Sequence, residues 1–279
     1  MGRKFKNSWS MVKASAQVLK SDKALVVFPI ISSIAVILIT VSFAIPIFSK
    51  GDAGSSFSGF NTSSLPVLFV YYFLTYFVII FFNSALVSAA MIKLKGGSPT
   101  LADGLKNALS HISSIVGYAL IASTVGLILR WVQERLGILG KIFAFISSLA
   151  WSLITFLVIP ILVTEEVGPI EAVKRSSQLL KKTWGEQLIG NIGIGLIFGL
   201  IIFGLIILFI PIALYTLSQG LLIAAISAGV IFGIAIIFLI IISSTINTIY
   251  TAALYRYAAE GVVSINFNED ILRNSFRQK

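Results

Sequence analysis

Six long stretches of apolar residues constrain this chain more than any other feature of its sequence. Each has about 18 residues or more, the length a helix needs to cross the hydrocarbon of a bilayer. Short segments that alternate apolar and polar residues, which are typical of a membrane β-barrel, are not visible. The sequence therefore predicts an all-α, polytopic membrane protein with six transmembrane helices. The expected spans are Leu25 to Phe48, Leu65 to Ile92, Ile112 to Leu129, Ile142 to Val163, Leu188 to Leu214 and Leu221 to Leu254.

The charges agree with this class and predict an orientation. Hydrophobic residues make up 57% of the chain and charged residues only 11%, far from the balance of a soluble domain. A net charge of +10 could suggest nucleic acid, but the cations lie on short links between apolar stretches, so no nucleic acid is expected. With the N-terminus inside, inner segments hold 17 of the 21 Lys and Arg residues and outer links hold 4. This positive-inside asymmetry predicts an inner (cytoplasmic) membrane protein with both termini cytoplasmic.

Three amphipathic segments each precede a pair of spans. Apolar residues recur in them at spacings of three and four, with lysines off the apolar stripe. That pattern is typical of a helix lying in the membrane interface, with its cations among the lipid headgroups. The stripes are Phe5, Trp9, Val12, Ala16 and Leu19; Leu101, Leu105, Ala108 and Ile112; and Ile170, Val173, Ser177, Leu180 and Trp184.

The first and third of these segments resemble each other in sequence. VKASAQVLK at 12–20 matches VKRSSQLLK at 173–181 at six of nine positions, and residues 105–112 form a weaker copy. We interpret this as three units of an amphipathic helix plus a transmembrane hairpin, at about 1–92, 98–163 and 168–254 in a single domain. Coincidence between basic amphipathic helices is the alternative. Residues 261–279 are expected to form a basic cytoplasmic tail.

The candidate site surrounds the end of the fourth span. Cations, a carboxylate and an aromatic ring meet there, and juxtamembrane cations attract anionic lipid by about 1 kcal/mol each. These residues could therefore bind a lipid headgroup or a partner protein. The alternative is that they only position the amphipathic helix. The candidates are Lys174, Arg175, Lys181, Lys182, Glu165 and Trp184.

Small residues at a spacing of four predict close helix packing at two places. Ser84, Ala85, Ser88 and Ala89 end the second span, and GxxxG pairs occur at Gly195/Gly199 and Gly229/Gly233. Such pairs let two helix backbones approach each other. We expect the glycine pairs to pack helices within the chain or to support contact with a membrane-protein partner or a second copy.

Catalytic and cofactor motifs are missing from the sequence. The chain has one histidine, His111, and no cysteine, and no nucleotide-binding or hydrolase motif stands in a suitable context. We therefore expect neither an enzyme nor a metal or cofactor, and we interpret His111 as an interfacial hydrogen-bonding residue. No charged residue lies near the middle of a span and no discontinuous span is evident, which argues against a coupled transporter.

Two functions lead at this level, and an intramembrane enzyme comes third because the sequence offers no nucleophile–base pair or metal-binding set. The first is a membrane-embedded scaffold, or a partner- or lipid-binding protein, that uses its basic amphipathic collar. The alternative is a transporter or lipid-handling protein with a cavity between hairpins, lined by Asn83, Ser243 and Asn247.

Several blocks of the sequence resemble a known family. They are residues 7–29, PTLADGLKNAL (99–109), TVGLILR (124–130) and GPIEAVKRSSQLLKKTWGEQLIGN (168–191). Together they resemble a prokaryotic family of six-helix membrane proteins of unknown function. The helix-then-hairpin plan is more distantly similar to the membrane domain of some glycerophosphodiester phosphodiesterases. The resemblance implies an architecture and not catalysis, since the phosphodiesterase chemistry belongs to a separate soluble domain.

Overall fold

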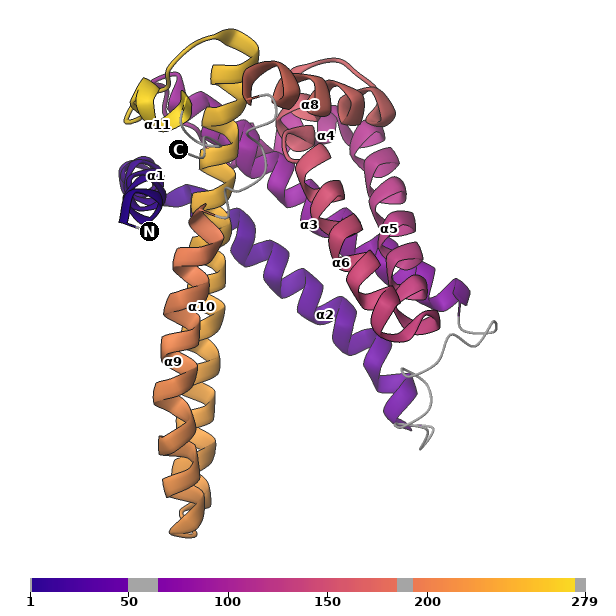
Figure 1. Cartoon of the computed structure of the whole chain (residues 1–279), viewed down its shortest axis with the longest axis vertical. Helices are drawn as coiled ribbons and strands as arrows, with labels where there is room; N and C mark the ends of the chain where they lie inside the picture. Colours follow the sequence, from indigo (N-terminus) through magenta and orange to yellow (C-terminus); the bar gives the residue numbers. More distant parts are fainter. Residues whose placement is uncertain (1, 50–64, 185–192, 274–279) are drawn as a thin grey trace.

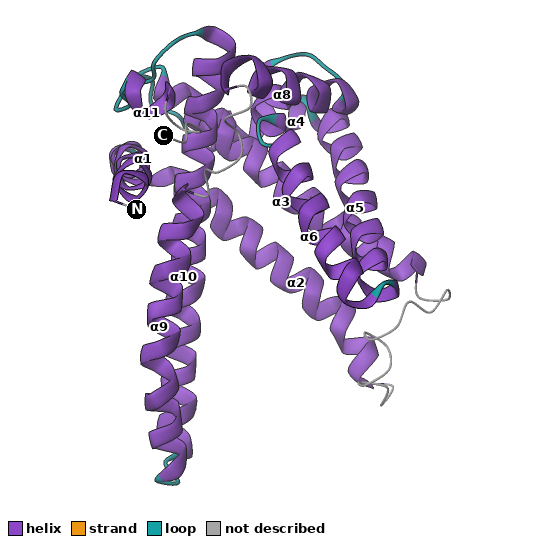
Figure 2. Cartoon of the chain, viewed as in Figure 1, coloured by secondary structure: helices purple, strands orange, loops and turns teal. Residues whose placement is uncertain are grey.

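The computed structural model describes residues 2–49, 65–184 and 193–273, and its described residues form helices and short links without a strand (Figure 2). Six helices are long and apolar enough to cross a membrane. This confirms the predicted all-α, multi-pass membrane class. The candidate spans are Lys23–Ile45, Leu65–Leu94, Ile112–Arg135, Gly137–Thr164, Ile197–Ser218 and Leu222–Glu260.

The spans form three hairpins, and a short helix precedes each of them (Figure 1). In the first, α1 (Gly2–Ser21) and the short helix η1 (Lys23–Val26) precede α2 (Val27–Ser49) and α3 (Leu65–Leu94). In the second, α4 (Leu101–Ser110) precedes α5 (Ile112–Arg135), α6 (Gly137–Ile154) and α7 (Val158–Thr164). In the third, α8 (Pro169–Trp184) precedes α9 (Gly193–Ser218) and α10 (Leu222–Tyr255), which continues into the π-helical turn η4 (Arg256–Glu260). The helix α11 (Glu269–Arg273) follows.

The fourth span is interrupted, so the expectation of uninterrupted spans is wrong at this place. Helix α6 ends at Ile154 and α7 begins at Val158. Pro160 accounts for the break, because its ring crowds the carbonyl of Phe156 and it has no N–H to donate there. The backbone N–H of Leu157 instead donates a hydrogen bond to Ser176 Oγ of α8, at 3.1 Å. A buried donor freed by the break is thus satisfied.

The packed core lies at one end of the bundle. There the closing halves of α3, α7 and α10 contact one another, and their buried residues form one cluster. In α3 the four small residues Ser84, Ala85, Ser88 and Ala89 are all buried, as predicted for a close helix contact. Helix α4 uses this surface, since a Cβ added to Gly104 would lie 2.6 Å from the carbonyl oxygen of Ala85. Small residues therefore allow the backbones to approach closely here.

The three short helices lie at this end and form what we call the collar, defined as α1, α4 and α8 (Figure 1). Each packs against the second span of the preceding hairpin: α4 contacts α3, and α8 contacts α7. Helix α1 has no preceding hairpin and contacts α10 of the last one. Helix α1 also contacts α9, so it packs on the last hairpin as a whole. We call this end of the molecule the collar end.

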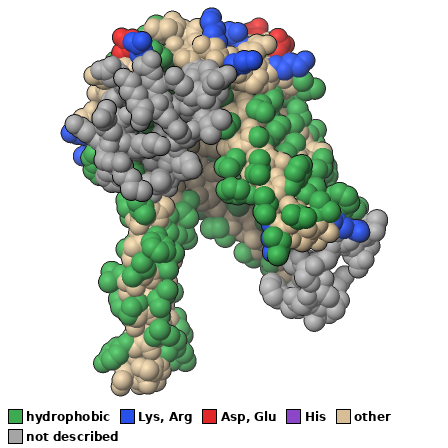
Figure 3. All heavy atoms as spheres, in the orientation of Figure 1, with side chains coloured by type: hydrophobic (Ala, Val, Ile, Leu, Met, Phe, Trp, Pro, Cys, Tyr) green, Lys and Arg blue, Asp and Glu red, His purple; other side chains and the backbone are tan. Residues whose placement is uncertain are grey.

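The hairpin of α9 and α10 stands apart from the other spans over its far half, as the space-filling view shows (Figure 3). Helix α3 lies against α5, whereas α10 has a much smaller contact with α2, and no comparable contact joins α6 to α9 among the described residues. Within the hairpin, the rings of Phe209 and Phe232 stack with their centroids 4.1 Å apart. The hairpin is thus held together by its own side chains.

The glycine pairs of this hairpin do not pack helices within the chain, so that part of the prediction is wrong. A Cβ added to Gly199, Gly229 or Gly233 would meet no atom within 4 Å. The surroundings of Gly195 lie outside the described part of α9. The hairpin glycines therefore face open space.

The first part of the predicted basic tail, up to Arg273, is packed against the bundle. Ser264, Phe267 and Leu272 are buried, and the rings of Tyr250 and Phe267 stack with their centroids 6.5 Å apart. The sequence signal that could have shown this is the set of apolar residues spread through the stretch, which includes Val262, Ile265, Phe267 and Leu272. Residues 274–279 of the predicted tail lie outside the described residues.

Candidate functional site

Helix α8 carries most of the predicted site, and its buried face consists of small and aliphatic residues. Ala172, Ser176, Leu179 and Leu180 are buried against the bundle. Gly168 and Pro169 begin the helix beside α5, where a Cβ on Gly117 would lie 2.8 Å from Pro169 Cγ. Because Ser176 also accepts the hydrogen bond from Leu157, α8 is fixed in rotation and depth.

The predicted apolar stripe of α8 is not its protein-facing side. Ile170 is 63% exposed, and Val173 and Ser177 are only partly buried. At about 100° per residue, this stripe lies about a quarter turn from the buried face. Leu180 belongs to both, and the side chain of Trp184 lies outside the described residues. Val173 packs against the core, so Ile170 is the exposed apolar residue of this stripe among the described residues, and it lies beside the cations.

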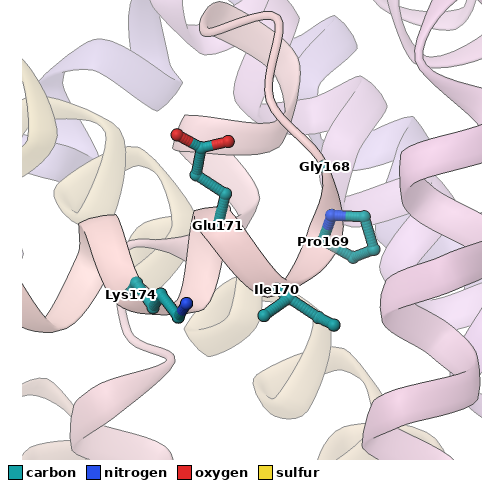
Figure 4. Close-up of a pocket in the computed structure, with 5 residues that line it drawn as sticks. All are labelled: Gly168, Pro169, Ile170, Glu171 and Lys174. Atoms are coloured by element: carbon teal, nitrogen blue, oxygen red, sulfur yellow. The ribbon is translucent and has the colours of Figure 1, made fainter.

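The cations of α8 fall on two sides of the helix. Lys174 and Lys181 lie next to the apolar stripe, and Figure 4 shows Lys174 and Ile170 on the same side of the helix, with Glu171 opposite. Lys182 follows the side of Glu171, and all three lysines are exposed. An open pocket of about 450 Å³ is lined by Gly168, Pro169, Ile170, Glu171 and Lys174.

Glu165 and Arg175 form an ion pair with each other and are not both free to bind a ligand. Arg175 Nε lies 3.3 Å from Glu165 Oε2, and the Tyr255 hydroxyl donates a hydrogen bond of 3.0 Å to Glu165 Oε1. The Arg175 side chain is 45% exposed, so this ion pair adds little stability of its own. It does connect the link before α8, α8 itself and α10. Two of the six predicted site residues are therefore engaged within the fold, and Lys174, Lys181 and Lys182 remain open to solvent or headgroups.

The collar helices present the same arrangement at corresponding positions. Each buries a pair of residues four apart, and each exposes a lysine two residues after the first of that pair. Large apolar side chains are exposed on all three as well. The buried pairs are Met11/Ser15, Gly104/Ala108 and Ala172/Ser176; the lysines are Lys13, Lys106 and Lys174; the exposed apolar residues include Trp9, Leu109 and Ile170.

Two polar residues that hold this end together were missed from the sequence. Asn107 Nδ2 of α4 donates hydrogen bonds to Ser88 Oγ of α3 at 2.8 Å and to the carbonyl of Val163 in α7 at 3.0 Å. Arg256 is buried, and its guanidinium donates to the carbonyl of Leu94 at 2.7 Å, to Ser264 Oγ at 3.2 Å and to Glu260 Oε2 at 3.1 Å. A charge at the end of an otherwise apolar helix was the available signal for Arg256.

His111 lies between α4 and α5, where it makes the hydrogen bonds expected of an interfacial residue. Its Nδ1 is 2.8 Å from the carbonyl of Asn107, which can only accept, so Nδ1 carries the proton. His111 also lines an open pocket of about 420 Å³ with Ser113, Ser114 and Glu166. The described residues contain no cluster of His, Cys, Asp and Glu side chains that could hold a metal.

Asp103 caps α4, and it is not a partner of His111. Thr100 donates to Asp103 Oδ2 from both its hydroxyl, at 2.7 Å, and its backbone N–H, at 2.9 Å. Asp103 N–H in turn donates to Thr100 Oγ1, which completes a capping box. These hydrogen bonds stabilise the carboxylate and hold the pKa of Asp103 below its ordinary value.

Taken together, the fold and the site define a multi-pass helical membrane protein with three collar helices packed on the spans at one end. The sequence model of a family of unknown function, DUF6159, matches residues 62–265, which is most of the chain. The protein belongs to this family. A comparison with curated proteins gave no match, so the similarity to the membrane domain of glycerophosphodiester phosphodiesterases has no support.

Proposed function

We propose that this protein is a non-enzymatic membrane protein that binds anionic lipid headgroups with its collar. The observation that carries the proposal is the stripe on α8 where Ile170 is 63% exposed beside the exposed Lys174 and Lys181. An apolar side chain next to two cations matches the acyl region next to lipid phosphates. The equivalent pairing of Trp9 with Lys13 on α1, and of Leu109 with Lys106 on α4, supports the same role for the other two collar helices.

The proposal has an orientation as its second part. The collar end would face the cytoplasm in the inner membrane, since it carries most of the cations. The chain has no cysteine, so Lys13→Cys on the collar and Leu139→Cys at the far end can be labelled separately. A membrane-impermeant maleimide should modify Leu139→Cys in intact cells and Lys13→Cys only after permeabilisation. The reverse result would overturn this orientation.

The lipid proposal is tested by removing two collar cations and, as a matched control, two far-end cations. Lys174→Gln/Lys181→Gln should retain about thirtyfold less phosphatidylglycerol than the parent protein after purification from mixed vesicles, because each of the two cations contributes about 1 kcal/mol. Arg135→Gln/Lys141→Gln removes the same charge from exposed positions at the far end and should retain nearly all of it. Both variants keep Arg175 and its partner Glu165. Equal lipid retention in the two variants would overturn the lipid proposal.

Partner binding and lipid handling are the further parts of this proposal. Self-association through Gly199, Gly229 and Gly233, together with Gly195, is supported by the open space that the first three glycines face. A lipid-handling role is the second candidate function, and the gap between the α9–α10 hairpin and the other spans favours it (Figure 3). Of its predicted lining residues, Asn247 is exposed and Asn83 and Ser243 are partly buried.

A further inference from the structure

Each collar helix packs on its span with the equivalent face. One residue lies at the centre of that face. It is Ala108 on α4, Ser176 on α8 and Ser15 on α1, and each is fully buried. These helices contact α3, α7 and α10 respectively. The position thus exists in three copies, two of which carry a hydroxyl.

In two of the three copies, the residue at this position agrees with whether the span is continuous or interrupted. Alanine faces a continuous span, and serine faces an interrupted one. Opposite Ala108, α3 is an uninterrupted helix. Near Ser176, the span is broken between α6 and α7, and Ser176 Oγ accepts the freed N–H of Leu157. Ser15 is the exception, because its buried hydroxyl has no hydrogen-bond partner while α10 is continuous. A buried hydroxyl without a partner is costly. Helix α10, which α1 contacts, corresponds to the broken span that α8 contacts.

Helix α10 has a polar segment where its buried part begins. Ser243, Ser244, Thr245, Asn247 and Thr248 carry side chains that compete with helical backbone hydrogen bonds. Thr245 Oγ1 donates to the carbonyl of Ile241 at 2.8 Å, and Thr155 Oγ1 makes the same bond to Trp151, at 2.7 Å, just before the break in the fourth span. Packing also changes here, since α10 is largely unburied before Ile241 and mostly buried from Thr245 onward, with Asn247 exposed.

We propose that α10 has a second state, interrupted after Thr245, in which Ser15 accepts the hydrogen bond of the backbone N–H that the interruption frees. Irregular backbone at membrane depth is stable only where protein covers it, and α1 provides that cover. In this state the far half of the α9–α10 hairpin pivots toward α2 and α6. There the hairpin packs side by side with α2 and α6, in the way that α3 already packs against α5. The proposal goes beyond lipid binding and does not depend on the collar cations.

The experiment measures the position of the hairpin by pulsed electron paramagnetic resonance in nanodiscs. Spin labels are attached at Val41→Cys in α2 and Ile234→Cys in α10, which are exposed positions in a chain without native cysteine. We expect two distance populations, a longer one for the state seen here and a shorter one for the pivoted hairpin. Ser15→Ala should reduce the ratio of short to long about fivefold, the effect of losing one buried hydrogen bond.

Ser176→Ala is the matched control, because it removes the corresponding hydroxyl from α8 and should leave the two populations unchanged. Ser15→Ala is close to isosteric, and a thermal unfolding curve like that of the parent protein shows that the fold persists. A single long distance in the parent protein would overturn the proposal. So would a short population that Ser15→Ala leaves unchanged, or one that Ser176→Ala reduces as strongly.

Discussion

The collar end and the far half of the α9–α10 hairpin are built from equally apolar helices but are packed in opposite ways. At the collar end, α3, α7 and α10 share a buried cluster, and side chains such as Asn107 and Arg256 join helices distant in sequence. In the far half of the hairpin, large apolar residues such as Phe203, Leu208 and Phe238 are exposed, and the glycines face open space.

The difference shows what holds helices together in a bilayer. Lipid tails are as apolar as leucine, so apolar surface alone gives two helices no reason to associate. Small residues and satisfied hydrogen bonds supply the specificity, and both are concentrated at the collar end. The far half of the hairpin has no small-residue contact and no hydrogen bond to its neighbours among the described residues. It can therefore stand apart and expose apolar side chains and glycines to lipid.

The largest effect is expected at Arg256, which tests whether the polar contacts of the collar end carry its stability. Arg256→Met keeps an unbranched buried side chain but leaves the carbonyl of Leu94 without its 2.7 Å hydrogen bond. We expect the free energy of unfolding to fall by about 2–4 kcal/mol, the usual cost of breaking a buried charged contact. The measurement is an unfolding titration with sodium dodecyl sulfate in mixed micelles.

Arg256→Lys is the control for this variant, because it keeps the charge but cannot reach Leu94, Ser264 and Glu260 at once. The free energy of unfolding of Arg256→Lys should lie between the values of the parent protein and of Arg256→Met. A change below about 0.5 kcal/mol in Arg256→Met, the range of ordinary surface substitutions, would show that the buried guanidinium does not stabilise the collar end.

A pair of glycine substitutions compares the two regions directly, with a smaller effect. Gly104→Ala places a methyl group 2.6 Å from the backbone oxygen of Ala85, so α4 must shift, and we expect a loss of about 1–3 kcal/mol. Gly233→Ala meets nothing within 4 Å and removes a poor helix former, so we expect no loss and a gain of up to about 1 kcal/mol. The same titration measures both.

Gly233→Leu extends this comparison to association between copies. If the open glycine face contacts only lipid, the larger side chain should leave the mass of the purified protein, measured by light scattering, unchanged. A dimer in the parent protein that dissociates in Gly233→Leu supports self-association through the hairpin. A loss of stability in Gly233→Ala as large as in Gly104→Ala would contradict the contrast between the two regions.

The candidate site was only partly predictable, for a reason visible on α8. Periodicity correctly separated Lys174, Arg175, Lys181 and Lys182 from the apolar residues. It could not tell which of two adjacent faces contacts protein, because Ala172 and Ser176 look unremarkable in a hydrophobicity pattern and yet form the buried face. Close contact between helices selects small residues, whereas a hydrophobic stripe is equally suited to lipid.

The sequence by itself determined the six spans and the uneven placement of cations, because the energy of placing a residue in hydrocarbon depends on that residue and its near neighbours. It also showed the relation between residues 12–20 and 173–181. Only the tertiary structure decided that α1 packs on the last hairpin, that Arg256 ties α10 to Leu94, and that one hairpin stands apart. Those features depend on partners more than a hundred residues away, and no local pattern in the chain specifies them.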